Sequence, residues 1–143
     1  MRGVGIALLL ALGAPPLARA QAPRVPPPLM QLGQQTYEVH CSSCHKTDGQ
    51  GMPPGLPALK GDSVVTGNPA ALIRVVAFGI PRTLMSSFGA KNSVERLTHE
   101  EIAAVLTFLR NSWGNDDRRK YGASAGSIVT PADVAREIDR AER

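Results

Sequence analysis

The chain has 143 residues, of which 16 are Lys or Arg and 12 are Asp or Glu, and its formal net charge is +4. Such a chain is long enough for one domain with a single core and too short for two. Arg2 and Arg19 lie in a leader that we expect to be removed, which brings the charge of the remaining chain close to neutral. The charge therefore favours neither a nucleic-acid partner nor a membrane surface.

Residues 1–20 have the pattern of a secretory signal peptide. Arg2 supplies a positive charge, residues 4–12 form a short apolar run, and Ala18-Arg19-Ala20 ends it in an A-x-A arrangement. The apolar run is much shorter than the ~20 residues that a membrane-spanning helix needs. We expect cleavage before Gln21, a periplasmic location and no membrane span in the mature chain. An uncleaved signal anchor is the alternative.

A proline-rich linker over residues 21–28 is predicted to be extended. Helical periodicity follows over residues 29–45. Gly33, Tyr37 and Cys41 are spaced four residues apart, so they lie along one face of this predicted helix.

The helix leads into Cys41-Ser42-Ser43-Cys44-His45, which contains both cysteines of the chain. The C-x-x-C-H pattern is typical of covalent haem attachment, in which each thiol forms a thioether with a haem vinyl group. The histidine that follows becomes the proximal ligand of the iron. We therefore predict one covalent haem c held by Cys41, Cys44 and His45. Attachment of this kind takes place outside the cytoplasm, in agreement with export.

Three other interpretations of the cysteine pair are weaker. A thioredoxin-type dithiol belongs in a strand–turn–helix unit, and no buried strand is predicted before Cys41. A structural zinc ion needs four ligands, and beyond the motif the chain offers only His40 and His99 as further His or Cys ligands. A structural disulfide would leave the position of His45 unexplained.

The remaining elements are also predicted to be helical. Residues 48–61 are rich in Gly and Pro and form an irregular loop. A short helix begins after Asn68 as N-cap and ends at Gly79. A longer helix begins with the capping box of Thr98 and Glu101 and ends at Gly114-Asn115. Its predicted apolar stripe consists of Ile102, Val105, Leu106, Leu109 and Trp113.

The tail, residues 116–143, is predicted to be a polar linker followed by a helix from Thr130-Pro131. Val134, Ile138 and Ala141 share one side of that helix. This side can pack on the core of the chain itself or dock on a partner. The pattern leaves both possibilities open.

A methionine is the best candidate for the sixth iron ligand. Met85 follows the Asn68 helix in a loop that can approach the iron from the face opposite His45, whereas Met52 is close to His45 in sequence and Met30 precedes the first helix. We predict Met85, with Met52 as the alternative; His40 is held on the proximal side by the tethered Cys41. His/Met ligation fills the coordination sphere and raises the potential, which suits an electron relay.

These residues resemble class I (monohaem) cytochrome c, in particular bacterial subunits paired with periplasmic dehydrogenases or oxidases. The similarity extends from about Gly33 to Asn115. Its most specific element is the C-x-x-C-H motif. It is supported by Gly33…Tyr37, Gly51…Leu56-Pro57-Ala58-Leu59, Met85-Ser86-Ser87-Phe88 and the segment from Val105 to Asn115.

The resemblance implies an all-α, cytochrome c-like helical fold around one covalently bound haem. It implies that Gly33 and Tyr37 cross the last core helix near Val105 and Phe108. The carbonyl of Pro57 would accept the Nδ1 proton of His45. In addition, Leu59 and Leu109 would pack on the haem. One position departs from the family, because Ser86 follows Met85 where relatives commonly have proline.

We therefore predict a signal peptide (1–20), a linker (21–28), a cytochrome c domain (29–115) and a linker with a C-terminal helix (116–143). The expected function is electron transfer between a dehydrogenase and a downstream cytochrome or oxidase, with no catalytic residues. The alternative is a haem ligand sensor or small peroxidase with a labile sixth ligand. Four basic residues are expected near the exposed haem edge: Lys46, Lys60, Arg82 and Lys91.

Overall fold

The computed structural model describes residues 24–91, 93 and 95–143. The predicted signal peptide and its cleavage site before Gln21 lie outside these residues. Within them the chain forms helices, short turns and one isolated bridge between Met52 and Leu56, with no strand longer than this bridge. The predicted all-α fold is confirmed. The helices are α1 (Pro27–His40), α2 (Ser42–His45), α3 (Ser63–Thr66), α4 (Pro69–Phe78), α5 (His99–Asn111), α6 (Arg118–Tyr121) and α7 (Pro131–Ala141).

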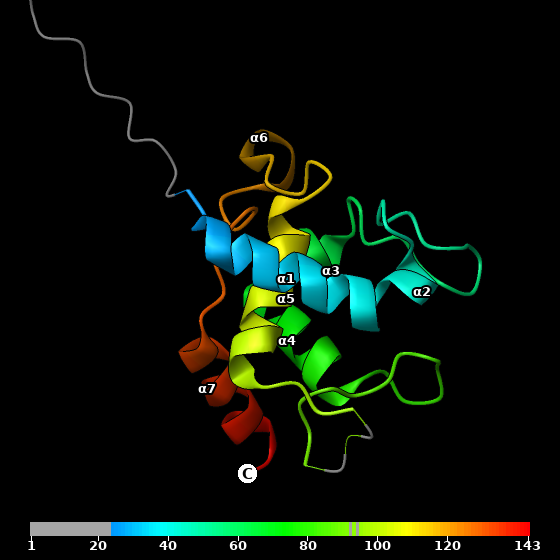
Figure 1. The fold of residues 1–143 in the computed structure, drawn as a ribbon, viewed down its shortest axis with the longest axis vertical. Helices are drawn as coiled ribbons and strands as arrows, with labels where there is room; N and C mark the ends of the chain where they lie inside the picture. Colours follow the sequence, from blue (N-terminus) through cyan, green and yellow to red (C-terminus); the bar gives the residue numbers. More distant parts are fainter. Residues whose placement is uncertain (1–23, 92, 94) are drawn as a thin grey trace, which may run out of the picture.

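The main packing contact is the crossing of α1 over α5 (Figure 1). Gly33 makes this crossing close, because a Cβ on it would lie 2.2 Å from the carbonyl oxygen of Ala104. One turn further along α1, the centroid of the Tyr37 ring lies 5.6 Å from the centroid of the Phe108 ring. The predicted crossing is therefore present, with Ala104 rather than Val105 beside the glycine.

The predicted N-caps of α4 and α5 and the predicted end of α4 at Gly79 are present. The Asn68 side chain accepts a hydrogen bond from the Ala70 amide at 2.9 Å, and Gly79 ends α4 with a positive φ of 69°. At the start of α5 the capping box of Thr98 and Glu101 is complete. Such caps depend on residues three positions apart at most, which is why the sequence alone predicts them.

Three predicted helix boundaries are wrong. The helix α1 begins at Pro27, inside the predicted extended linker of residues 21–28. The first predicted helix divides at Cys41 into α1 and α2, because Cys41 has φ −123° and breaks the regular turn. The helix α5 ends at Asn111 instead of reaching Gly114-Asn115. Trp113 therefore lies outside it, with a φ of 54°, and its ring packs edge-on against Tyr37 at 5.3 Å. Tertiary packing of the indole outweighs the local helical pattern.

The tail is more ordered than a linker and packs on the core of the chain itself. Asp117 caps the short helix α6, and α7 lies against α4 and α5. Val134 and Ile138 are 0% and 6% exposed, so this apolar side is not left free for a partner. Ala141, predicted on the same side, is exposed. In Figure 1 α7 lies on the side of the molecule away from α2.

Candidate haem site

The two cysteines lie on one helical turn at the end of α1. Cys41 is the N-cap of α2, and its carbonyl accepts hydrogen bonds from the amides of Cys44 at 3.2 Å and His45 at 2.9 Å. Both cysteines are free and half-buried. This turn places two thiols and one imidazole together at the surface of the core, as attachment of a haem edge requires.

The His45 imidazole is oriented by a backbone carbonyl. Its Nδ1 lies 2.9 Å from the carbonyl oxygen of Pro57, and the residue is 9% exposed. With Nδ1 donating to this carbonyl, Nε2 carries the lone pair and is the ring atom that can ligate a metal. The resemblance implied this same contact.

The loop that presents the Pro57 carbonyl depends on Gly51. Gly51 has a φ of 62°, and a Cβ on it would lie 2.4 Å from the carbonyl oxygens of both Leu56 and Pro57. Its amide donates to the His45 carbonyl at 2.9 Å. Paired hydrogen bonds between Met52 and Leu56 close the turn. Glycine at this position therefore lets the Pro57 carbonyl reach the imidazole.

Met85 belongs to the loop between α4 and α5. In Figure 1 this loop lies on the same side of the molecule as α2. Gly79 fixes the start of this loop: it has φ 69°, and a Cβ on it would lie 2.6 Å from the Met85 carbonyl oxygen. Met85 is half-buried and packs against the hydrophobic core, as do Cys41 and Leu59. Met52, the alternative, is 40% exposed in its turn. The packing favours Met85.

The two predicted apolar haem contacts differ in burial. Leu109 of α5 is 4% exposed and belongs to the core, whereas Leu59 is half-buried at its border. Asn115 holds the loop of Leu59 in place, a role that the sequence pattern does not predict. Its side chain accepts from the Gly61 amide at 2.7 Å and donates to the carbonyls of Leu59 and Leu109 at 3.2 and 2.8 Å. No local pattern marks this residue, since its loop partners lie more than fifty residues away.

Tyr37 packs next to the candidate site and contacts the segment that follows His45. Its hydroxyl donates to the carbonyl of Lys46, directly after His45, and its ring packs with those of Phe108 and Trp113. The pKa of Tyr37 is raised by burial and, to a lesser extent, by Cys41 and Asp48. The group therefore stays a neutral phenol and a hydrogen-bond donor. It couples α1 to the backbone that carries the predicted ligand.

The thiol chemistry disfavours a redox dithiol. Burial, with a contribution from Cys44, raises the pKa of the Cys41 thiol to about 12. Reactive thioredoxin-type cysteines instead have lowered pKa values. Among the described residues there is no group of three or more His, Cys, Asp or Glu side chains that could hold a metal ion.

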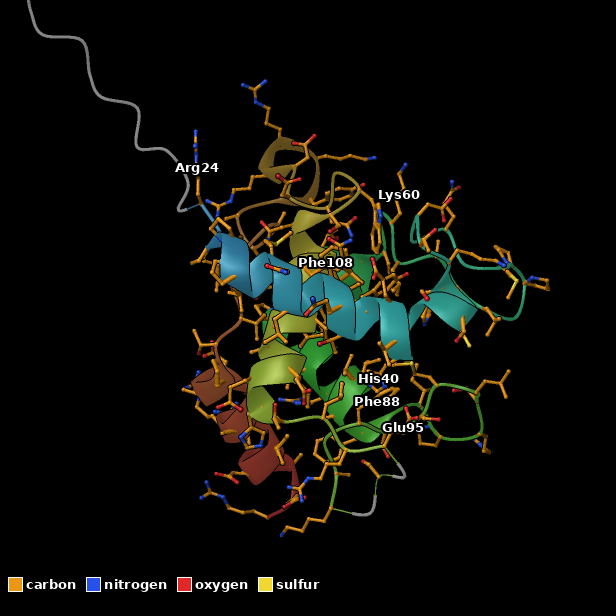
Figure 2. All side chains as sticks on the ribbon, in the orientation of Figure 1. Arg24, His40, Lys60, Phe88, Glu95 and Phe108 are labelled. Atoms are coloured by element: carbon orange, nitrogen blue, oxygen red, sulfur yellow. The ribbon has the colours of Figure 1, made fainter. Side chains whose placement is uncertain are left out.

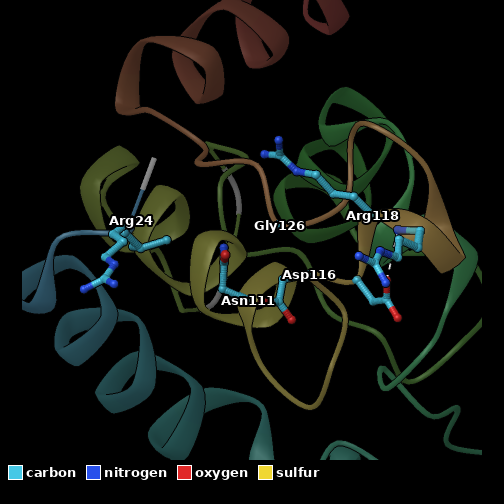
Figure 3. A pocket seen from close by; sticks show the side chains of 8 residues that line it. Arg24, Asn111, Asp116, Arg118 and Gly126 are labelled. Carbon is cyan, nitrogen blue, oxygen red and sulfur yellow. Dashed lines mark hydrogen bonds between the residues drawn. The ribbon is translucent and has the colours of Figure 1, made fainter. Parts of the chain in front are cut away.

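A pocket of about 510 Å³ lies elsewhere, between the start of α1, the end of α5 and α6. Figure 3 shows Arg24 and Arg118 on opposite sides of it. None of the predicted haem residues lines it. It is therefore separate from the candidate haem site, whose donor set of two thiols, a free imidazole Nε2 and a thioether fits a haem c.

Comparison with known proteins agrees with this donor set. Residues 28–109, more than half of the chain, match the family described as cytochrome C oxidase, cbb3-type, subunit III. The chain belongs to the class I cytochrome c family. The predicted family is confirmed, and with it a domain that binds haem c covalently and carries electrons.

In some relatives of this cytochrome, the matching region is only part of a longer chain. The chain is 37% identical over 114 residues to the alcohol dehydrogenase (quinone) cytochrome c subunit of Gluconacetobacter polyoxogenes, covering 75% of this chain and 22% of that subunit. It is 38% identical over 92 residues to the fructose dehydrogenase cytochrome subunit of Gluconobacter japonicus, covering 58% and 19%. It is 33% identical over 96 residues to cytochrome c-552 of Thermus thermophilus, covering 62% and 72%. This cytochrome thus spans about a fifth of the length of the two dehydrogenase subunits.

Proposed function

We propose that this cytochrome is a periplasmic carrier with one haem c, which takes single electrons from a dehydrogenase and passes them to another cytochrome or an oxidase. Cys41 and Cys44 would hold the haem, His45 and Met85 would ligate its iron, and Leu59 and Leu109 would pack on it. When bound, the haem supplies a one-electron couple. The contact between His45 Nδ1 and the Pro57 carbonyl at 2.9 Å is the observation that carries this proposal.

The chain's own groups support the carrier role in two ways. The Pro57 carbonyl fixes the imidazole tautomer and ring orientation, so the ligand is positioned before any electron arrives. The Met85 loop bends back on itself, with the Ile80 amide donating to the Met85 carbonyl at 3.1 Å and the Met85 amide to the Thr83 hydroxyl at 3.1 Å. Ligands held in this way change position little between redox states.

The dehydrogenase partner and the periplasmic location are parts of the proposal. The named relatives are cytochrome subunits of quinone alcohol dehydrogenase and fructose dehydrogenase, which support a dehydrogenase as electron donor. In the part of the chain that the structure describes, none of the helices is long and apolar enough to cross a membrane. The leader pattern of residues 1–20 supports export.

The proposal places basic residues around the haem edge, where they would meet redox partners. Lys46, Lys60 and Arg82 are exposed. Lys91 is exposed as well, but it forms an ion pair with Glu142 at 3.1 Å, so its charge is partly neutralised by the tail. We assign the docking of redox partners to the first three.

The visible spectrum of the matured protein, with and without carbon monoxide, tests the proposal. We expect a low-spin spectrum in both redox states, a red sulfur-to-iron band in the oxidised protein and no response to the gas. In Met85→Ala the band is lost and the reduced protein binds carbon monoxide, because the sixth position opens. Met52→Ala serves as the matched control and should keep the wild-type spectrum.

A high-spin or gas-reactive spectrum of the unmodified protein would overturn the carrier proposal and favour a ligand sensor or small peroxidase. If the sulfur-to-iron band were lost in Met52→Ala and kept in Met85→Ala, the sixth ligand would be Met52 rather than Met85. A haem content other than one per chain would contradict the proposed stoichiometry.

A further inference from the structure

His40, the last residue of α1, contacts the loop that carries Met85 at two points. Its Nδ1 lies 3.0 Å from Oε2 of Glu95, and its ring centroid lies 6.1 Å from that of Phe88 with the rings at 72°. Figure 2 shows the three side chains close together below the end of α1. His40 directly precedes Cys41, so this contact joins the haem-attachment turn to the segment after α4.

Among the described residues, the Met85 loop is otherwise joined mainly to α4 and to the tail. The Gly89 and Ala90 amides both donate to the Ala77 carbonyl at 3.0 Å, and Lys91 pairs with Glu142 at 3.1 Å. The turn over residues 79–85 is closed mainly by bonds within itself. Beyond it, the Phe88 amide donates to the Val76 carbonyl at 3.0 Å, and the Phe88 carbonyl accepts from the Leu97 amide at 2.8 Å. Phe88 is 8% exposed and thus fixes the loop to α4. Within the described part of the chain, the contact with His40 joins the same loop to α1.

We propose that His40 and Glu95 form a latch that holds the Met85 loop against the haem-attachment end of α1 and so limits how readily Met85 leaves the iron. The proposal rests on Met85 being the sixth ligand. His40 and Glu95 are positioning residues, since their contact is with each other and with Phe88 rather than with the haem. Imidazole Nδ1–H can donate to the carboxylate whether or not the ring is charged.

The effect of the latch is limited by solvent. The side chains of His40 and Glu95 are 22% and 64% exposed, and exposed pairs of this kind contribute little individually. A second carboxylate also faces His40: the pKa of Glu101 is lowered by its hydrogen bonds with Thr98 and, more weakly, by His40. Glu101 belongs to α5, so it does not tie the loop. We therefore expect a severalfold effect on loop opening rather than loss of the fold.

Imidazole binding to the oxidised, haem-loaded full-length protein tests the latch, since imidazole binds only when Met85 has left the iron. We expect Glu95→Gln and His40→Phe each to increase the apparent affinity for imidazole about three- to tenfold, the range of one weak hydrogen bond. His40→Phe retains an aromatic ring beside Phe88. The double variant should show no more than the larger single effect, because both changes break one contact.

Glu142→Gln is the matched control. It removes the same charge from another ion pair of the same loop, that of Lys91 and Glu142, without touching His40. Imidazole affinity should rise less in Glu142→Gln than in Glu95→Gln, because the pair of Lys91 and Glu142 joins the loop to the end of α7 rather than to the haem-attachment end of α1. A Glu95→Gln affinity equal to that of Glu142→Gln would overturn the latch, as would additive effects in the double variant.

Hydrogen–deuterium exchange provides a readout that does not depend on Met85 ligation. We expect faster exchange over residues 79–91 in Glu95→Gln, with no change over α7. If the unmodified protein lacks the sulfur-to-iron band, the ligation proposed above fails, whereas the exchange result still reports on the latch. If the unmodified protein has the sulfur-to-iron band but Glu95→Gln shows unchanged exchange over residues 79–91, the latch is contradicted and the ligation is not.

Discussion

Gly51 shows at the scale of a single residue how backbone conformation can set the electronic properties of a ligand. In Gly51→Ala the new Cβ would have to displace the Pro57 carbonyl oxygen, which lies 2.4 Å from the ideal Cβ position. The alanine would also have to keep the φ of 62°, which is strained for a residue with a side chain. We expect a loss of about 1–3 kcal/mol in unfolding free energy, the range for a strained backbone position. Weakening of the His45–Pro57 hydrogen bond should also make the imidazole a poorer donor. The reduction potential should therefore rise, by on the order of 50 mV, given about 59 mV per tenfold change for one electron.

Gly55 provides the control for this prediction in the same loop. A Cβ at Gly55 would meet nothing within 4 Å. Gly55→Ala should therefore leave both the potential and the stability close to those of the unmodified protein. Urea unfolding and redox potentiometry measure the two quantities. An equal shift of the potential in both variants would mean that Gly51 does not act through Pro57.

At the scale of an element, α7 is part of the core of this cytochrome. Ile138 is 6% exposed, and the buried Glu137 of the same helix pairs with Arg74 of α4 at 2.8 Å. We expect Ile138→Ala to lower the unfolding free energy of the isolated protein by about 2–4 kcal/mol, as for other buried Ile→Ala changes. The haem spectrum should be unchanged, because α7 lies away from the candidate site. Urea unfolding monitored by circular dichroism checks the first expectation.

Arg136→Ala is the matched change on the exposed side of α7. It removes one surface ion pair, that with Asp133, and should cost less than about 1 kcal/mol. If Ile138→Ala were equally mild in the isolated protein, the apolar side of α7 would be available to a partner rather than packed on α4 and α5. Analytical ultracentrifugation of the unmodified protein would then reveal the assembly.

Across the whole molecule, the features that the sequence predicted depend on neighbours in the chain. The caps at Asn68 and Thr98 and the C-x-x-C-H turn each involve residues a few positions apart. Arg110, by contrast, is 0% exposed and donates to carbonyls of α3 and of the tail, including that of Val65 at 2.6 Å. The contact of His40 with Glu95 spans 55 residues. One sequence contains no local signal for such contacts, since only the fold brings the partners together.

The distribution of charge over the whole molecule leads to the last prediction. Without residues 1–20 the chain would be nearly neutral, yet Lys46, Lys60 and Arg82 are exposed in the segments that carry His45, Leu59 and Met85. Oxidation of the reduced protein by anionic ferricyanide should therefore slow severalfold as salt rises from about 0.01 to 1 M, over which the screening length falls from about 30 to 3 Å. A cationic cobalt complex should show the opposite trend. Stopped-flow absorbance measures both rates.

Charge-reversal variants then distinguish the effect of charges near the candidate haem site on the oxidation rate from the effect of the net charge. Lys60→Glu should reduce the salt dependence with ferricyanide, whereas Arg136→Glu, which makes the same change in net charge on α7, should reduce it much less. Figures 1 and 2 place Lys60 in the loop after α2 and α7 on the other side of the molecule. Equal effects of the two reversals would mean that the net charge alone steers the oxidant. In that case the three basic residues would have no special place in docking, and partner recognition would have to depend on uncharged contacts at the haem edge.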